Sequence, residues 1–278
     1  MQFLINNPQF WRKEGINEEV AEEMEMELKE GKINLPKKIR EKLGLGKNTK
    51  IKVKFNKNGV YIEKADPNLT KVYIEPTSDC NLNCKTCVRH SWDEEMGFME
   101  MKSYNKLIKQ LKEFNNLEKI SFWGIGEPLF HPQIGKMVEL ASKLKVKTQI
   151  ITNGLLLDKE KARNLLKSGL DSLVVSVDGT SPETMADIRS GADLQTIINH
   201  VQDFRNLRDK LNKNCEIGIE YVIMKSNVDE LKELRKLAFK MGASFIFLTN
   251  LLPYTEEMTD EILYSFSISR SQPEIRTE

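Results

Sequence analysis

The chain has 278 residues, of which 40% are hydrophobic and 30% are charged, and this is enough for one large folded domain and a smaller one. Its 42 basic and 41 acidic residues leave a formal net charge of +1, so the overall charge favours neither DNA nor an anionic membrane as the main partner. No apolar run reaches the roughly 18 residues of a membrane span, and no signal peptide begins the chain, so we expect a cytoplasmic protein without a membrane segment.

The first 68 residues predict a small β-rich domain. Residues 51–55 alternate apolar and polar side chains, as in a half-buried strand. Asn58 and Gly59 form a hairpin signal, and residues 60–62 have the composition of the returning strand. The turn signal of Asp66, Pro67 and Asn68 then marks the expected linker to the rest of the chain.

The segment from Gly31 to Gly46 resembles the swapped-hairpin domain of AbrB-type transition-state regulators, with its Leu-Pro, Ile-Arg and Leu-Gly-Leu steps among many basic residues. That resemblance implies a homodimer formed through this domain, or the docking of a partner, and such domains often bind DNA. A basic hairpin is also a common solvated surface, so docking is favoured over DNA binding. The expected domains are residues 1–68 and 69–278.

The second domain alternates short apolar strands with amphipathic helical stretches. The strands are expected at residues 72–75, 120–123, 148–151, 173–177, 217–223 and 245–248. Parallel strands need crossover helices on the outside, so six such units predict an α/β fold with a partial (βα)6 TIM-like barrel. Functional residues should then follow the strands directly.

Three cysteines, Cys80, Cys84 and Cys87, follow the first of these strands. Such close spacing favours a metal site in a reducing compartment over disulfides. Three thiolates can hold one face of a [4Fe-4S] cluster and leave one iron open to bind a substrate. The alternative is structural zinc, for which His90 would complete a tetrahedron of three cysteines and one histidine. Cys215 stands far from this group and is expected to be a small buried hydrophobic residue.

The spacing of these cysteines resembles the signature of the radical S-adenosylmethionine (SAM) superfamily. Residues 123–128 close the second strand and resemble the GGEP motif of that family, and further polar motifs close the third and fourth strands. The resemblance implies one cluster with three cysteine ligands, and SAM bound beside it. The candidate cofactor-binding residues are Gly124, Gly126, Glu127, Pro128, Thr152, Asn153, Ser176 and Asp178, and the candidate metal ligands are Cys80, Cys84 and Cys87.

The resemblance also assigns roles to some of these side chains. Glu127 would supply negative charge for the ammonium of SAM, and its neighbouring glycines would let the backbone approach the ligand. Ser176 and Asp178 would face the ribose and carboxylate of SAM. No general acid or base can be named, and His131 is expected to be a hydrogen-bonding loop residue.

One position departs from the family pattern. The residue before the third cysteine is commonly aromatic in the family and packs on the adenine, whereas this chain has Thr86. Phe122 or Trp123 could provide the stacking ring instead, and residues 218–221 and 248–250 match the strands that line the adenine only loosely.

Residues 73–97 and 180–189 are similar to archaeal radical SAM maturases associated with tungsten-containing aldehyde ferredoxin oxidoreductases. This implies reductive cleavage of SAM to a 5′-deoxyadenosyl radical, for maturation of a tungsten- or molybdenum-pterin oxidoreductase or its cofactor. The implied partners are that oxidoreductase and an electron donor such as ferredoxin or flavodoxin. Members of this group continue into a cysteine-rich extension, and no cysteine follows Cys215, so the extension is expected to be missing here or lost.

Three other functions remain open at this stage. The first is a radical SAM enzyme that acts on another peptide or small molecule, and only its substrate distinguishes it. The second is a redox-sensing DNA-binding regulator with a structural metal site, for which binding to a specific duplex should depend steeply on salt. The third is a zinc-stapled interaction protein, which would be colourless.

Overall fold

The computed structural model describes residues 35, 37–42, 51–56, 59–64, 69–91, 93, 95–268 and 273–277. The chain divides into two compact units, Met1–Pro67 and Asn68–Glu278. Within the described residues, no helix combines the length and apolar character needed to cross a membrane.

The first unit contains the hairpin expected from the sequence. Strand β1 (Ile51–Asn56) pairs antiparallel with β2 (Gly59–Lys64), and a short helix, α1 (Lys37–Lys42), precedes them. The expected hairpin is therefore confirmed. Most of the segment that resembles the swapped-hairpin regulators lies outside the described residues, so dimerisation and DNA binding through it stay predictions.

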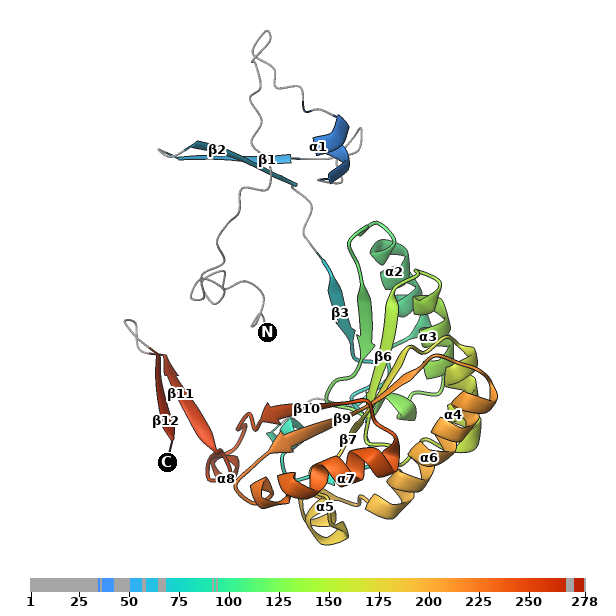
Figure 1. Cartoon of the computed structure of the whole chain (residues 1–278), viewed down its shortest axis with the longest axis vertical. Helices are drawn as coiled ribbons and strands as arrows, with labels where there is room; N and C mark the ends of the chain where they lie inside the picture. The colour runs from blue at the N-terminus through green and yellow to red at the C-terminus, as the bar shows by residue number, and fades with distance from the viewer. Residues whose placement is uncertain are drawn as a thin grey trace. The chain divides into compact units, whose positions relative to one another are not determined.

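The second unit is built on a six-stranded parallel sheet with the strand order β10-β9-β7-β6-β5-β3. Its strands are β3 (Lys71–Ile74), β5 (Lys119–Phe122), β6 (Lys147–Thr152), β7 (Ser172–Ser176), β9 (Glu216–Ile223) and β10 (Phe245–Asn250). All six expected strands are present, with ends that differ by at most two residues. The sheet curls into a partial barrel, which confirms the predicted fold class (Figure 1).

Helices cover the convex side of this sheet (Figure 1). They are α2 (Met101–Leu111), α3 (Ile134–Ser142), α4 (Lys159–Lys167), α5 (Pro182–Ile188), α6 (Leu194–Lys210) and α7 (Leu231–Met241), with short helices η1 (Val88–Ser91), η2 (Pro128–Phe130), η3 (Val228–Glu230) and α8 (Glu256–Thr259) in the loops. Asp158, Ser181 and Asp193 cap the amino ends of α4, α5 and α6 by accepting backbone N–H groups. Two small pairs complete the unit: β4 (Asn83–Cys84) with β8 (Arg189–Ser190), and β11 (Tyr264–Ile268) with β12 (Pro273–Thr277).

Successive side chains along each strand alternate between two chemically different faces of the sheet. Ile120, Phe122 and Ile150 are fully buried and belong to the main hydrophobic core with the helices. Because successive side chains of a strand point to opposite faces, Ser121 and Gln149 lie on the concave side. The concave side therefore carries the polar positions and is where a ligand can be held.

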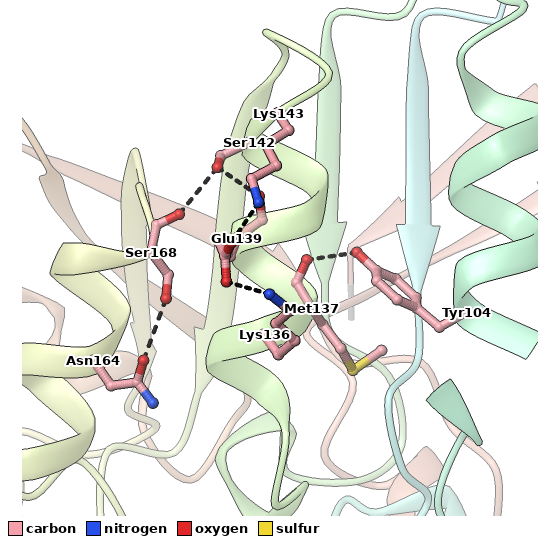
Figure 2. A network of polar contacts seen from close by, with 8 residues as sticks. All are labelled: Tyr104, Lys136, Met137, Glu139, Ser142, Lys143, Asn164 and Ser168. Carbon is pink, nitrogen blue, oxygen red and sulfur yellow. Dashed lines mark hydrogen bonds and ion pairs between the residues drawn. The ribbon is translucent and has the colours of Figure 1, made fainter. Parts of the chain in front are cut away.

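Hydrogen bonds join three neighbouring helices on the convex side (Figure 2). The buried hydroxyl of Tyr104 on α2 donates to the carbonyl oxygen of Met137 on α3 at 2.7 Å. Ser142 at the end of α3 donates to the carbonyl oxygen of Ser168, just after α4, at 3.0 Å. Hydrogen bonds from Lys136 of α3 and from Lys143, directly after α3, lower the pKa of the half-buried Glu139 to about 2. The hydrogen bonds of Tyr104 and Ser142 thus tie α2, α3 and the end of α4 together.

Candidate active site

A cavity of about 560 Å³ lies at the carboxyl ends of the strands, on the concave side. Its walls include Cys80, Cys84, Cys87, Gly124, Gly126, Glu127, Thr152, Asn153, Ser176, Arg189 and Glu220. Most of the candidate residues from the sequence thus come together around one space. The two exceptions are Pro128, which is buried at the start of η2, and Asp178, which lies behind the wall.

The cysteine loop is anchored to a distant part of the chain. Cys84 of β4 pairs with Arg189 of β8 in an antiparallel bridge. The next residue, Lys85, donates its backbone N–H to the carbonyl oxygen of Ile188 at 2.9 Å. This contact holds the loop against the segment that follows the fourth barrel strand, and nothing in the local sequence predicts it.

Two of the three thiols, those of Cys80 and Cys84, sit in surroundings that disfavour the thiolate form in the protein without metal. Burial raises the pKa of Cys80, and it raises the pKa of Cys84 to about 11 although Arg189 acts in the opposite direction. All three cysteines are free of disulfides, and among the described residues no three histidine, cysteine or acidic side chains form a ready-made metal site. Binding of a metal must therefore displace protons and draw the thiolates together.

The donor set suits an iron–sulfur cluster. The backbone N–H of Leu82 points to the sulfur of Cys80 at 3.4 Å, and Nε of Arg89 points to the sulfur of Cys87 at 3.4 Å. Hydrogen bonds of this kind to cysteine sulfur help to set the reduction potential of a cluster. His90 instead places Nε2 at 2.8 Å from the carbonyl oxygen of Cys84 and does not line this cavity, which weighs against the zinc alternative.

The glycine turn packs directly on the cysteine loop. A Cβ atom on Gly126 would lie 2.0 Å from the carbonyl oxygen of Thr77 and 2.7 Å from that of Asp79. The backbone N–H of Glu127 donates to the same Asp79 oxygen at 2.8 Å. Gly126 is therefore needed for close contact between two backbone segments, whereas the expectation from the sequence was that this glycine lets the backbone approach a ligand.

Glu75 is a site residue that the sequence reasoning missed. Its Oε1 accepts the backbone N–H groups of Ile125 and Gly126, and a Cβ atom on Gly124 would lie 2.4 Å from the same oxygen. Glu75 follows β3 directly, so an acid immediately after a strand was the signal that could have identified it.

Glu127 is buried, and three donors hold its carboxylate. It accepts the N–H of Leu129 at 2.9 Å, the hydroxyl of Thr152 at 2.7 Å and the N–H of Asn153 at 2.7 Å. Burial raises the pKa of Glu127, and these hydrogen bonds oppose that change. Two of the bonds reach Oε1 and one reaches Oε2, so Oε2 retains more capacity to accept from a ligand. Asn153 also donates from its side chain to Asn81 in the cysteine loop at 2.8 Å.

Arg189 brings a positive charge to the cavity wall. Its Nε lies 2.7 Å from Oδ2 of Asp178, whose other oxygen accepts the N–H of Val222 at 3.0 Å. Burial lowers the pKa of Arg189, but the charge of Asp178 and the hydrogen bond to it act in the opposite direction, and the pKa of Arg189 lies above its ordinary value. Asp178 therefore acts on a ligand in the cavity only through Arg189. The sequence reasoning did not identify Arg189.

A second polar pair spans the fourth and fifth barrel strands. The hydroxyl of Ser176 donates to Oε2 of Glu220 at 2.8 Å, and both residues line the cavity. Both lie on the concave face, since Ser176 is opposite Glu220 in the parallel register. This pair can offer an acceptor to ligand hydroxyl groups.

The two rings that were expected to stack on adenine differ in their burial. Phe122 is fully buried, with its ring centroid 6.2 Å from that of Tyr104, so it cannot stack on a ligand. Trp123 is 41% exposed and lines the cavity. The expected secondary roles also hold: Cys215 is a buried core residue, and His131 is a buried loop residue that makes hydrogen bonds.

Comparison with known proteins decides the family. Residues 74–238 match the model of the Radical SAM superfamily. The chain is a member of the radical SAM superfamily. It is therefore a radical SAM enzyme, and the family implies a [4Fe-4S] cluster and SAM as cofactors.

Two relatives of this radical SAM chain carry names that describe different activities. It is 33% identical over 202 residues to the "Tungsten-containing aldehyde ferredoxin oxidoreductase cofactor-modifying protein" of Pyrococcus furiosus, covering 71% of this chain and 56% of the relative. It is 28% identical over 189 residues to a "Probable GTP 3',8-cyclase" of Methanococcus maripaludis, covering 66% of this chain and 59% of that relative. The chain thus spans somewhat more than half the length of each.

Solved structures share the fold. Streptococcus suis SuiB bound to S-adenosylmethionine superimposes with a TM-score of 0.57 at 22% identity, covering 68% of this chain and 42% of SuiB. The structure described as native anSMEcpe with bound AdoMet gives a TM-score of 0.55 at 22% identity, covering 66% of this chain and 52% of the other. At this identity the likeness establishes the architecture alone.

Proposed function

We propose that this protein reductively cleaves SAM to a 5′-deoxyadenosyl radical and uses it in the maturation of a tungsten- or molybdenum-pterin oxidoreductase or its cofactor. The observation that carries the cleavage activity is a single cavity lined by three cysteines, the Gly124–Glu127 turn and Arg189. The tungsten-related target is supported by the name of the Pyrococcus furiosus relative.

Cys80, Cys84 and Cys87 would hold the cluster from one loop. When bound and reduced, the cluster supplies one electron to the sulfonium of SAM, which breaks a carbon–sulfur bond and yields methionine and the radical. The hydrogen bonds that already point to the sulfurs of Cys80 and Cys87 would support the thiolates in this position.

Two opposite charges in the wall would orient the methionyl group of SAM. Arg189 can bind the carboxylate, because Asp178 engages Nε and other guanidinium N–H groups remain available. Glu127 can accept from the ammonium through Oε2. Thr152 and Asn153 act as positioning residues, because they fix the carboxylate of Glu127.

The remaining wall residues would hold the adenosyl group. Ser176 and Glu220 form a polar pair that can accept ribose hydroxyl groups. Trp123 offers an exposed ring at the edge of the cavity, and ring stacking on adenine would replace the aromatic residue missing at Thr86. Enclosure by these side chains would limit access of water and oxygen to the reacting atoms.

The test begins with anaerobic reconstitution with iron and sulfide. Dithionite and SAM are then added, and 5′-deoxyadenosine is quantified by chromatography. We expect its formation to depend on reductant and on reconstitution. A reconstituted protein that binds SAM and forms no 5′-deoxyadenosine would refute the cleavage activity.

The target requires a second assay. An aldehyde ferredoxin oxidoreductase prepared without tungsten, and its isolated pterin cofactor, are each added to the cleavage reaction. We expect one of them to increase 5′-deoxyadenosine formation and to change in mass. If neither does either, the maturation role is wrong while the cleavage activity stands. The same reaction with reduced ferredoxin or flavodoxin in place of dithionite identifies the electron donor.

A further inference from the structure

Three lysines lie side by side at the amino ends of neighbouring barrel strands. In the parallel register Lys71 of β3 is opposite Lys119 of β5, and Lys119 is opposite Lys147 of β6. The next residues, Val72, Ile120 and Thr148, face the helices, so these three lysines, here called the lysine row, lie on the concave face. Like charges on adjacent strands repel, so three neighbouring lysines are unfavourable for folding and call for a functional explanation.

The row is only partly neutralised by the protein. Lys147 forms an ion pair with Asp171 at 3.1 Å, but that carboxylate also accepts the N–H and hydroxyl of Thr148. Among the described residues, Lys71 and Lys119 have no ion pair. Burial and the charge of Lys71 lower the pKa of Lys119, and Glu216 opposes them. An anion beside Lys119 would relieve this unbalanced charge.

The row borders a second cavity, of about 440 Å³, that Lys119 and Lys147 line. One wall is aromatic: Phe245 and Phe247 of β10 pack edge to face with ring centroids 5.2 Å apart. Cationic and aromatic surfaces thus face the same space.

Polar groups form the floor of this second cavity. Gln149 accepts from the hydroxyl of Ser121 at 3.1 Å and donates to Ser172 at 3.4 Å. Glu216 lies opposite Ser172 in the register and lines the cavity as well. The carboxylate of Glu216 can accept N–H donors of a ligand in this cavity.

The second cavity and the active-site cavity follow each other along the concave face. Gln149 lines the second cavity, and Ile151, two residues further along the same strand, lines the active-site cavity. Two residues of a strand advance about 7 Å. A ligand of modest length held at the lysine row can therefore reach the space where SAM would be cleaved.

We propose that the second cavity binds the substrate of this enzyme, a small molecule in which a planar ring with N–H donors carries a phosphate group. The lysine row binds the phosphate, Phe245 and Phe247 pack on the ring, and Glu216 accepts its N–H groups. This inference rests on the proposed function, because it gives the class of molecule that the radical attacks.

Guanosine monophosphate is a suitable probe, since it has a phosphate and a planar ring with N–H donors. Its binding to the full chain is measured by calorimetry, without reductant, beside guanosine and ribose 5-phosphate. We expect each partial probe to bind about tenfold more weakly or worse, because each lacks one set of contacts. Equal binding of guanosine, or of ribose 5-phosphate, or no binding of guanosine monophosphate, would overturn the inference.

Variants locate the binding in this cavity. Lys119→Gln should weaken guanosine monophosphate about tenfold and leave guanosine unchanged, and Lys119→Arg should restore part of the loss. Lys109→Gln, on the exposed side of α2, is the matched control and should bind like the wild type. Equal affinities of the Lys119→Gln and Lys109→Gln variants would refute the site.

The two proposals fail separately. Formation of 5′-deoxyadenosine without lysine-dependent nucleotide binding overturns only the substrate site. Lysine-dependent binding without any cleavage of SAM overturns the proposed enzymatic function, and with it the role of the bound molecule as substrate, while the nucleotide site itself stands.

Discussion

Asp178 and Arg189 form the most buried ion pair in the described part of the chain, with side-chain exposures of 1% and 14% at 2.7 Å. Replacing Asp178 leaves a guanidinium without its counter-charge in a largely dry position. Breaking a buried pair costs about 3–5 kcal/mol. Because Arg189 also borders a cavity that water can enter, we expect the lower end, about 3 kcal/mol, for Asp178→Asn.

The assay is urea unfolding followed by circular dichroism. Asp178→Ala should cost about 1 kcal/mol more than Asp178→Asn, because it also leaves the N–H of Val222 without an acceptor. Asp187→Asn is the matched control: it breaks an exposed pair with Lys85, whose side chains are both 62% exposed, and should cost less than about 1 kcal/mol. Combining Asp178→Asn with Arg189→Gln should cost clearly less than the sum of the single changes. An additive double variant, or an Asp178→Asn cost equal to the control, would refute the reasoning.

Three further predictions follow from the site and the core. Gly126→Ala would place a Cβ atom 2.0 Å from the oxygen of Thr77, so it should lower the melting temperature and the iron content, while Gly97→Ala, which meets nothing within 4 Å, should change neither. Glu127→Gln should weaken SAM binding about tenfold in calorimetry and keep the iron; unchanged affinity would contradict the role of Glu127. Burial raises the pKa of Cys215 from 9.0 to about 12. The stability that the neutral thiol contributes is therefore complete below pH 9 and is lost as the pH rises toward 12. In Cys215→Ala the urea midpoint should depend less on pH over this range than in the wild type, and an equal pH dependence would argue against this reasoning.

The fold could be predicted because its signals are local. Each barrel strand is a short apolar run, and the Asn58–Gly59 step marks the hairpin of the first unit. Strand order required only the rule that neighbouring parallel strands are joined by outer helices. The structure adds which face each residue occupies, and this distinguishes buried Phe122 from exposed Trp123.

The site was predictable in its motifs and not in its contacts. The cysteines and the Gly124–Glu127 turn were identified because they follow strands in a recognisable spacing. The pairing of Cys84 with Arg189 and the hydrogen bonds of Glu75 to the glycine turn join residues far apart in sequence. Such contacts depend on tertiary packing, so Arg189 had no local signal, whereas the position of Glu75 directly after a strand was a local signal that was overlooked.

The central claim is that the three-cysteine loop enables cleavage of SAM by this chain. The most direct test compares 5′-deoxyadenosine formation by reconstituted wild-type, Cys84→Ala and Cys215→Ala proteins at equal concentration. We predict that the wild type and Cys215→Ala form it and that Cys84→Ala, with too few ligands for the cluster, does not. Formation at the wild-type rate by Cys84→Ala, or none by the reconstituted wild type, would contradict the account.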